Sequence, residues 1–251
     1  MRRLFQEATT IWQEDGLVKL VRKTTKFGYD NFIRPLLPTH VVRYNGVLVR
    51  ASRVGDSFIP WRATDIPNYE DALVCGIRRY VEKNDTVVII GGGWGVSTVV
   101  AAEQVGKRGR VITYEGGERT VEKIKETVQL NGLSDRISIQ HSVVGQAISL
   151  RDDSGGAKVV CPIEIPNCDV LVLDCEGAET QILEQMEIFP RNVVVETHGI
   201  YDAPKATVLS KLSDAGYDLI ETRVAERRLL EECMRNGIYV VYAKRSDEID
   251  C

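Results

Sequence analysis

Residues 91–95 form a glycine-rich loop, the first feature of this sequence that could do chemistry. They read GGGWG and directly follow the apolar run Thr86–Ile90. Because glycine has no Cβ atom, such a loop can turn sharply and let a ligand approach the main chain. Gly91, Gly93 and Gly95 are spaced G-x-G-x-G, which fits neither the G-x-G-x-x-G fingerprint of nicotinamide sites nor a phosphate-binding P-loop. A tight turn without a ligand is the alternative, but four glycines in five residues favour a nucleotide-type site.

A carboxylate closes the next predicted strand. Glu115 lies 24 residues after Gly91 and directly follows the run Arg110–Tyr114. In nucleotide-binding α/β folds, an acid at about this distance accepts hydrogen bonds from the two hydroxyl groups of a ribose. The alternative is a solvated acid at the start of the helix that follows. We expect Glu115 to bind a ribose.

Three further carboxylates gather at the end of the strand predicted at 169–174. Asp174, Glu176 and Glu179 lie within six residues. Carboxylates this close repel one another, so they need a compensating cation, a cationic ligand or backbone N–H donors. A divalent ion held by Glu176 and Glu179 is one alternative, because hard cations prefer oxygen ligands. Capping of local N–H groups by Glu179 is another.

His198 follows the strand predicted at 192–196 and is the first candidate for a general base. An unperturbed imidazole has a pKa of about 6.5 and can accept a proton near neutrality. Asp174 is the second candidate base. Each residue also has a structural alternative: a loop histidine with one hydrogen bond, or a carboxylate at a strand end.

The elements that must position these residues alternate between strands and helices. This alternation predicts an α/β fold with a doubly wound, mostly parallel sheet and helices on both faces. Ligands of such sheets bind at the carboxyl ends of the strands, where the residues above are found. Strands are predicted at 86–90, 110–114, 137–141, 169–174, 192–196, 217–222 and 237–244, and helices at 68–83, 97–106, 118–130, 178–188 and 204–215.

Two segments precede this alternating region. Residues 41–49 place Asn45-Gly46 between β-forming residues, which predicts a β-hairpin whose two turn residues have positive φ. Residues 1–38 carry apolar residues at helical spacing, with seven Lys/Arg against four acids. We expect an N-terminal amphipathic helical extension over 1–38 and one domain over 39–251. A basic amphipathic segment can lie on an anionic membrane surface. A helical cap on the domain or a dimer contact is the alternative.

Composition limits the class of protein. The chain has 251 residues, and its 32 basic and 36 acidic residues give a net charge of −4. Hydrophobic residues make up 43% and charged residues 27% of the chain, which excludes a disordered or collagen-like chain. An acidic balance argues against a dedicated nucleic-acid binder.

The cysteines and the apolar runs bear on the compartment. None of the six cysteines forms a C-x-x-C pair, which disfavours a zinc knuckle and favours buried, reduced thiols. No apolar run approaches the roughly 18–20 residues that span a bilayer, and residues 1–7 lack the apolar core of a secretory signal. We expect a cytoplasmic protein, which a membrane contact of 1–38 would place at the inner membrane surface.

The segment Asp174–Glu179 reads D-C-E-G-A-E, and with the upstream glycine loop it resembles the FkbM family of S-adenosylmethionine-dependent methyltransferases. The resemblance covers about residues 40–245. It implies the Rossmann-like fold of class I methyltransferases, S-adenosylmethionine as cofactor, and transfer of a methyl group to oxygen. The acceptor would be a hydroxyl or carboxyl group of a small molecule or a glycan, which could be lipid-linked, with no nucleic-acid partner.

The resemblance also implies roles for individual residues. Asp174 and Glu176 would face the cofactor and the acceptor, so that Asp174, Glu176 and His198 are the predicted catalytic residues. No residue is predicted as a metal ligand. Trp94 would cover the cofactor or pack under the following helix. Cofactor contacts are expected from the methionine-binding glycines Gly91, Gly93 and Gly95, the ribose-binding Glu115, and the adenine-flanking segment 141–144 with Ser142 and Val143.

One position departs from the family pattern. The family usually has an acid two positions before the first glycine, where this chain has Ile89. Asp174 or Glu70 could take over its role of fixing the amino-acid end of the cofactor. Two other classes stay open: a non-catalytic binding module on the same fold, for which Ile89 is the reason, and an oxidoreductase with a nicotinamide cofactor, which the glycine spacing disfavours. The sequence sets neither the acceptor nor the oligomeric state.

Overall fold

The structure is a computed structural model that describes residues 39–53, 65–145, 156–201 and 203–246. The chain divides into two compact units, one of Met1–Val41 with Ala51–Thr64, and one of Val42–Arg50 with Asp65–Cys251. The second unit contains every candidate residue named above. The helices predicted over 1–38, and the membrane contact expected of them, lie outside the described residues.

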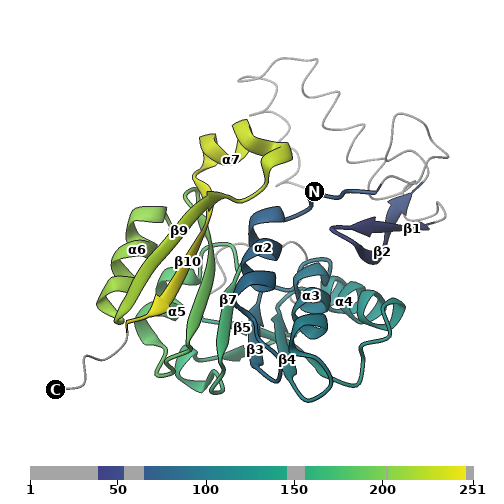
Figure 1. The fold of residues 1–251 in the computed structure, drawn as a ribbon, viewed down its shortest axis with the longest axis horizontal. Helices are drawn as coiled ribbons and strands as arrows, with labels where there is room; N and C mark the ends of the chain where they lie inside the picture. Colours follow the sequence, from purple (N-terminus) through teal and green to yellow (C-terminus); the bar gives the residue numbers. More distant parts are fainter. Residues whose placement is uncertain (1–38, 54–64, 146–155, 202, 247–251) are drawn as a thin grey trace, which may run out of the picture. The chain divides into compact units, whose positions relative to one another are not determined.

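An eight-stranded sheet forms the centre of the second unit (Figure 1). Its spatial order is β6-β5-β4-β3-β7-β8-β10-β9. All pairs are parallel except those of β10, which runs antiparallel to both β8 and β9. The predicted doubly wound, mostly parallel sheet is therefore confirmed. The strands are β3 (Thr86–Ile90), β4 (Arg110–Glu115), β5 (Ile137–Val144), β6 (Lys158–Val160), β7 (Val170–Leu173), β8 (Asn192–His198), β9 (Tyr217–Val224) and β10 (Ile238–Arg245).

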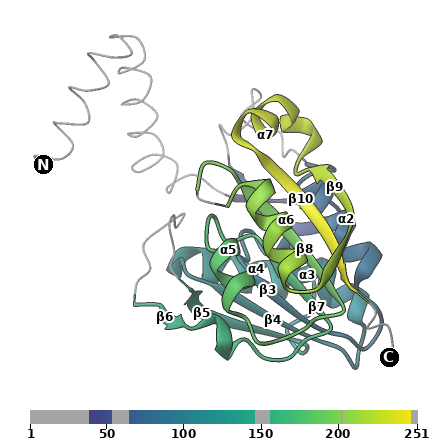
Figure 2. The same ribbon diagram turned by 90° about the vertical axis from the view of Figure 1, so that its left-hand side faces the viewer.

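Helices pack on both faces of this sheet (Figure 2). On one face α3 packs against both α2 and α4, and on the other α5 packs against α6. The central strands β3 and β7 are buried on both faces, as their unbroken runs of Val, Ile and Leu require. The helices are α2 (Asp71–Tyr80), α3 (Val96–Val105), α4 (Glu118–Leu130), α5 (Glu179–Gln185), α6 (Lys205–Asp214) and α7 (Leu230–Asn236), with short 3₁₀ turns η3 (Pro162–Glu164) and η4 (Arg227–Leu229).

Several strands extend beyond their predicted ends, and two of these extensions carry candidate residues. The strand predicted at 137–141 runs on to Val144, where it pairs with β6, and the strand predicted at 192–196 runs on to His198, where it pairs with β10. Both extensions depend on partners far away in the sequence, which local patterns do not reveal. As a result, Ser142, Val143 and His198 stand on strands and not in loops.

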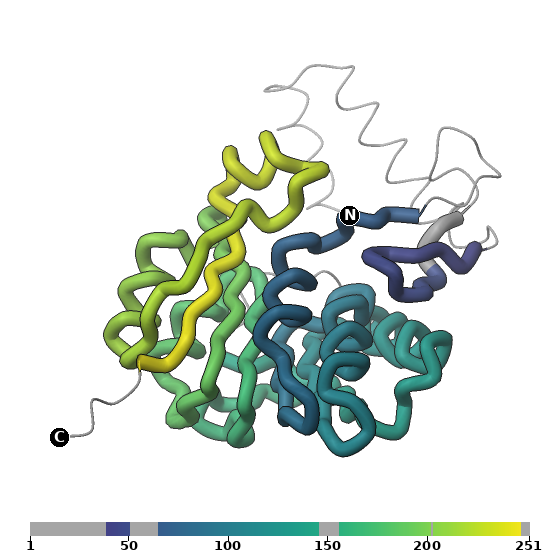
Figure 3. The backbone as a smooth tube through the Cα atoms, viewed as in Figure 1, coloured from purple at the N-terminus to yellow at the C-terminus, as the bar shows by residue number. Residues whose placement is uncertain are grey.

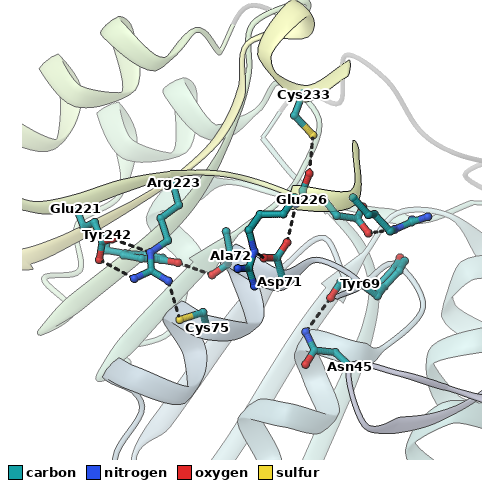
Figure 4. Close-up of polar contacts among 12 residues, drawn as sticks. Asn45, Tyr69, Asp71, Ala72, Cys75, Glu221, Arg223, Glu226, Cys233 and Tyr242 are labelled. Carbon is teal, nitrogen blue, oxygen red and sulfur yellow. Dashed lines mark hydrogen bonds and ion pairs between the residues drawn. The ribbon is translucent and has the colours of Figure 1, made fainter. Parts of the chain in front are cut away.

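The predicted hairpin is present as β1 (Thr39–Tyr44) and β2 (Val47–Arg53). Its turn residues Asn45 and Gly46 have φ of 49° and 92°, as the Asn-Gly pair predicts. The Asn45 side chain donates a hydrogen bond to the Tyr69 carbonyl at 3.0 Å (Figure 4). This contact ties the turn to the segment that leads into α2.

The C-terminal strands hold α2 in place. In Figure 3 the yellow β10 lies beside the yellow-green β9. The buried Tyr242 hydroxyl of β10 donates to the Ala72 carbonyl at 2.5 Å, and Arg223 of β9 donates to Cys75 Sγ at 3.2 Å (Figure 4). Asp71, the first residue of α2, pairs with Arg227. These contacts fix α2 and the lead into β3.

The five cysteines within the described ranges are free thiols. Cys161 is exposed and Cys233 is buried, so the expectation of buried thiols holds only for part of the set. Cys161 directly precedes the short turn η3, in which Ile163 is exposed as well. Over the same ranges, no helix is long and apolar enough to cross a membrane.

Cys168 should react far more slowly than Cys161 with iodoacetamide at pH 8. Burial raises the pKa of Cys168 from 9.0 to about 12, so its thiolate fraction is about a thousandfold lower than that of an ordinary cysteine. Only the thiolate is the nucleophile. Peptide mass spectrometry over a time course measures both rates in one sample. Equal rates at the two sites would contradict the half-buried position of Cys168.

Candidate functional site

A cavity opens at the carboxyl ends of β3, β4, β5 and β7, where the sequence places the candidate residues. It encloses about 550 Å³ of space, part of which is open to solvent. Seven predicted residues line it together: Gly91, Gly93, Glu115, Ser142, Val143, Asp174 and Glu176. Five further residues line the cavity without any signal in the sequence beyond their place next to candidate residues: Ile90, Tyr114, Gly116, Cys175 and Ala178.

Gly91 is required where the chain leaves β3. Its φ is +93°, a conformation that L side chains rarely adopt. A Cβ atom at this position would lie 1.7 Å from the Asp174 carbonyl oxygen, which is an impossible contact. The Asp174 N–H donates to the Ile90 carbonyl at 2.9 Å, so the ends of β3 and β7 run side by side here. Bare main chain and the Asp174 carboxylate therefore meet at one wall of the cavity.

Glu115 fixes the glycine loop from the neighbouring strand. Its Oε2 accepts hydrogen bonds from the Gly92 and Gly93 N–H groups at 3.1 and 3.3 Å, and its Oε1 accepts one from Gly117 at 2.9 Å. Gly117 directly precedes α4, so the expected helix-start contact is also present. Each carboxylate oxygen can accept two hydrogen bonds, so Oε1 has capacity for a ligand hydroxyl.

Gly95 and Trp94 lie outside the described lining of the cavity. A Cβ atom on Gly95 would lie 3.2 Å from the Ile124 main chain, so Gly95 allows α3 to pack closely on α4. The Trp94 ring is 6.2 Å from the Tyr44 ring, and the Lys123 ammonium group lies 4.5 Å from its centroid. The structure thus gives both residues packing contacts, and their expected contact with a cofactor has no support from this geometry.

Glu179 is the centre of a buried polar cluster behind the cavity. Its side chain is fully buried and accepts hydrogen bonds from the Cys175 and Gly177 N–H groups at 3.0 and 2.8 Å. His198 Nδ1 lies 2.9 Å from Glu179 Oε1. The expected capping of local N–H groups is confirmed. Because both oxygens serve these contacts, the geometry does not support Glu176 and Glu179 as a pair of metal ligands.

The electrostatics of this cluster depend on His198. Burial would raise the pKa of Glu179, but the hydrogen bond and charge of His198 outweigh it and hold that pKa below its ordinary value. Burial would lower the pKa of His198, but Glu179 and the nearby Asp174 and Glu176 carboxylates outweigh it and raise that pKa. His198 also lies outside the described lining of the cavity, which makes it the less well placed candidate for a general base. Asp174, which lines the cavity, is the better placed candidate.

Glu176 adopts a strained conformation at the cavity wall. Its φ is 52°, in the left-handed region that residues other than Gly, Asn and Asp seldom occupy. Such strain costs about 1–3 kcal/mol and is concentrated at functional sites. Ile89 is fully buried in the core, so its side chain cannot replace the missing family acid. Of the two proposed substitutes, Asp174 lines the cavity and Glu70 lies outside its described lining.

The strand order gives the fold class. The strand order, the antiparallel β10 and the cavity above β3 and β4 form the Rossmann-like fold of class I methyltransferases. No family model matches the chain. Over 164 residues it is 26% identical to the ribosomal protein L11 methyltransferase of Bacillus pumilus (strain SAFR-032), covering 64% of this chain and 48% of that protein. The chain thus spans about half the length of this curated relative.

Solved structures agree on the fold. The ribosomal protein L11 methylase of Lactobacillus delbrueckii subsp. bulgaricus superposes with a TM-score of 0.51 and 14% identity, covering 75% of this chain and 84% of that one. A fibrillarin of Aeropyrum pernix in complex with S-adenosyl-L-methionine superposes with a TM-score of 0.45 and 13% identity, covering 65% and 68%. The methyltransferase relative found by sequence supports the expected enzyme class and, with it, the cofactor. These proteins do not support the FkbM family in particular.

The comparisons correct the expected partners. The sequence analysis expected a small-molecule or glycan acceptor, no nucleic acid, and a peripheral membrane contact. The matching proteins are instead named as methylases of a ribosomal protein. The acceptor had been inferred from the FkbM resemblance, and the physical error was to argue against nucleic acid from a net charge of −4. Net charge averages over the entire surface and does not describe the one region that meets the acceptor.

Proposed function

We propose that this chain is an S-adenosylmethionine-dependent methyltransferase whose cofactor binds in the cavity above β3, β4, β5 and β7. The observation that carries the proposal is the pairing of bare main chain at Gly91 and Gly93 with three carboxylates, Glu115, Asp174 and Glu176, in one cavity. S-adenosylmethionine supplies a methyl group on a positively charged sulphur. Carboxylates attract that charge, and they repel the diphosphate of a nicotinamide dinucleotide. The similarity to methyltransferases supports the same assignment.

Each wall of the cavity has a proposed part in binding. Glu115 accepts hydrogen bonds from the ribose hydroxyls. Its contacts with the Gly92 and Gly93 N–H groups hold the glycine loop next to the ribose. Ser142 and Val143 of β5 flank the adenine. Gly91 and Gly93 let the methionine part lie against the main chain. Asp174 closes the cavity near the methyl group and takes the role that an acid at position 89 has in the FkbM pattern.

The chemistry asked of the protein is positioning. Methyl transfer is an in-line displacement, and holding the acceptor and the methyl carbon close and collinear can lower the barrier by several kcal/mol. A hydroxyl acceptor also needs a base, and we propose that Asp174 accepts its proton. Glu176, strained at the cavity wall, faces the acceptor. The proposed acceptor is a hydroxyl or carboxyl group of a protein, since the relatives are named for a protein acceptor.

Kinship with the FkbM family is a narrower proposal. It rests on the D-x-E-G-x-E pattern of residues 174–179, in which Asp174 and Glu176 line the cavity and Glu179 supports it from behind. Oxygen as the methylated atom depends on the same pattern. Neither statement affects the assignment of cofactor and reaction class.

Isotope transfer tests the proposed reaction. The purified chain is incubated with a cell extract and S-adenosylmethionine carrying a deuterated methyl group, and proteins are searched by mass spectrometry for the added mass. We expect a labelled protein that is absent when the chain is omitted. If the chain binds the cofactor but no fraction of the extract yields a labelled product, the result would favour the binding module. A change in the fluorescence of NADH when it is titrated with the chain would favour the oxidoreductase.

Replacing Glu115 by glutamine should weaken binding of S-adenosylhomocysteine by about 10- to 100-fold. Hydrogen bonds to a charged acceptor contribute about 1.5–3 kcal/mol, and the amide loses charge and half of its acceptor capacity. Isothermal calorimetry measures the change. Glu118→Gln is the matched control, because Glu118 is exposed at the start of α4 and should leave the affinity unchanged. Equal affinity in Glu115→Gln and the parent chain would remove Glu115 from the site.

A further inference from the structure

The ends of β7 and β8 bring together one imidazole and two carboxylates whose joint arrangement the cofactor cavity does not explain. The ligand atoms of Asp174, Glu196 and His198 all lie within 4.8 Å of one another. His198 Nε2 is 3.5 Å from Asp174 Oδ1 and 3.7 Å from Glu196 Oε1. Both separations are longer than an N–H···O hydrogen bond of about 2.7–3.2 Å. Two ligand atoms at about 2.1 Å from one tetrahedral ion lie about 3.4 Å apart, close to the values seen here.

The histidine is held in the orientation that metal binding needs. The His198 side chain is 7% exposed, and its Nδ1 lies 2.9 Å from Glu179 Oε1. Glu179 is itself fixed by two main-chain N–H groups. A carboxylate on one ring nitrogen sets the tautomer and directs the lone pair of the other nitrogen toward a metal. Here that other nitrogen, Nε2, faces Asp174 and Glu196.

The charges of this region also favour a cation. Asp174, which follows β7, Glu179 of α5 and Glu196 of β8 surround one imidazole, with Glu176 near by. The side chains of Asp174 and Glu196 are 9% and 13% exposed. Carboxylates removed from water need compensation by an ion or by hydrogen bonds. A divalent ion between Asp174, Glu196 and His198 would supply two charges.

We propose that Asp174, Glu196 and His198 form a binding site for a divalent transition ion such as Mn²⁺ or Zn²⁺. One imidazole with two carboxylates suits these ions better than Ca²⁺ or Mg²⁺, which prefer oxygen ligands alone. Three protein ligands leave at least one coordination position open. Asp174 also lines the cofactor cavity, so the site adjoins it. This role rests on the proposed function: the ion would hold the acceptor oxygen beside the methyl group.

Manganese binding tests this site directly. The full chain is freed of metal with EDTA, dialysed, and titrated with Mn²⁺ while electron paramagnetic resonance follows the free ion. We expect one ion per chain, displaced by Zn²⁺. Glu196→Gln should weaken binding about tenfold or more, whereas Glu187→Gln, an exposed acid outside the cluster, should leave it unchanged. No saturable binding of either ion, or equal binding by parent and Glu196→Gln, would overturn the site.

A second measurement does not depend on a variant that must fold. Electron–nuclear double resonance of Mn²⁺ on the parent chain should show coupling to one nitrogen, as His198 requires. Absence of nitrogen coupling would overturn the ligand set.

Calorimetry with S-adenosylhomocysteine on the metal-free chain separates this proposal from the proposed function. Nucleoside binding without Mn²⁺ binding would reject the metal site and leave the methyltransferase assignment. Mn²⁺ binding without nucleoside binding would leave the metal site and reject the assignment.

Discussion

Asp174→Asn should lower the rate of methyl transfer at least about 100-fold while the fold stays intact. Asparagine has the same shape, but it cannot accept the proton of an acceptor hydroxyl, and a positioned base contributes about 10²–10⁴-fold. It also removes a negative charge from the wall of the cavity. The main-chain hydrogen bond from residue 174 to Ile90 remains. Transfer of the deuterated methyl group is the readout, with cooperative thermal melting as the check on folding.

Asp214→Asn is the control for this variant. Asp214 is exposed at the end of α6, far along the chain from the cavity residues, and its loss should leave transfer unchanged. Full transfer by Asp174→Asn would show that Asp174 takes no part in the reaction. A loss of cooperative melting in Asp174→Asn would instead assign it to the support of the fold, against the expectation.

Glu179→Gln should lower the free energy of unfolding by about 3–5 kcal/mol, the cost of breaking a buried ion pair. The fully buried carboxylate accepts from Cys175, Gly177 and His198, and an amide can serve only part of this set. The NH₂ group of the glutamine would face an N–H donor that the carboxylate now accepts from. Urea unfolding followed by circular dichroism gives the difference.

Glu184→Gln is the matched control on the same helix. Glu184 is 59% exposed and pairs with Lys211, so its loss should cost less than about 1 kcal/mol. Similar midpoints and slopes for parent and Glu179→Gln would mean that the cluster of Glu179 and His198 contributes little to stability, contrary to the contacts seen.

Much of the fold could be predicted because its signals are local. The run 86–90 is apolar at every position but the first, as a central parallel strand must be, and the helix predicted at 118–130 has those bounds in the structure. Asn45-Gly46 specified its own turn through two positive φ angles. The short strand β6 and helix α7 were missed because neither carries a periodic pattern.

Only the site residues that lie at the ends of predicted strands could be placed from the sequence. Asp174 and Glu115 follow apolar strands directly, so their places in the cavity follow from the topology. The contact between Glu179 and His198 joins a helix to a strand 19 residues later, and no spacing rule reveals it. Likewise, Gly95 has the same spacing as Gly91 and Gly93, yet it serves the packing of α3 on α4. The spacing of the glycines predicts the loop, but only the packing around them shows which glycines line the cavity and which serve the contact between helices.

Titration of the purified chain with S-adenosylhomocysteine in a calorimeter most directly tests whether the cavity above β3 and β4 is a cofactor site. We predict saturable binding of one molecule per chain, weakened by Glu115→Gln and unchanged by Glu118→Gln. No heat and no thermal shift at millimolar ligand would contradict the assignment.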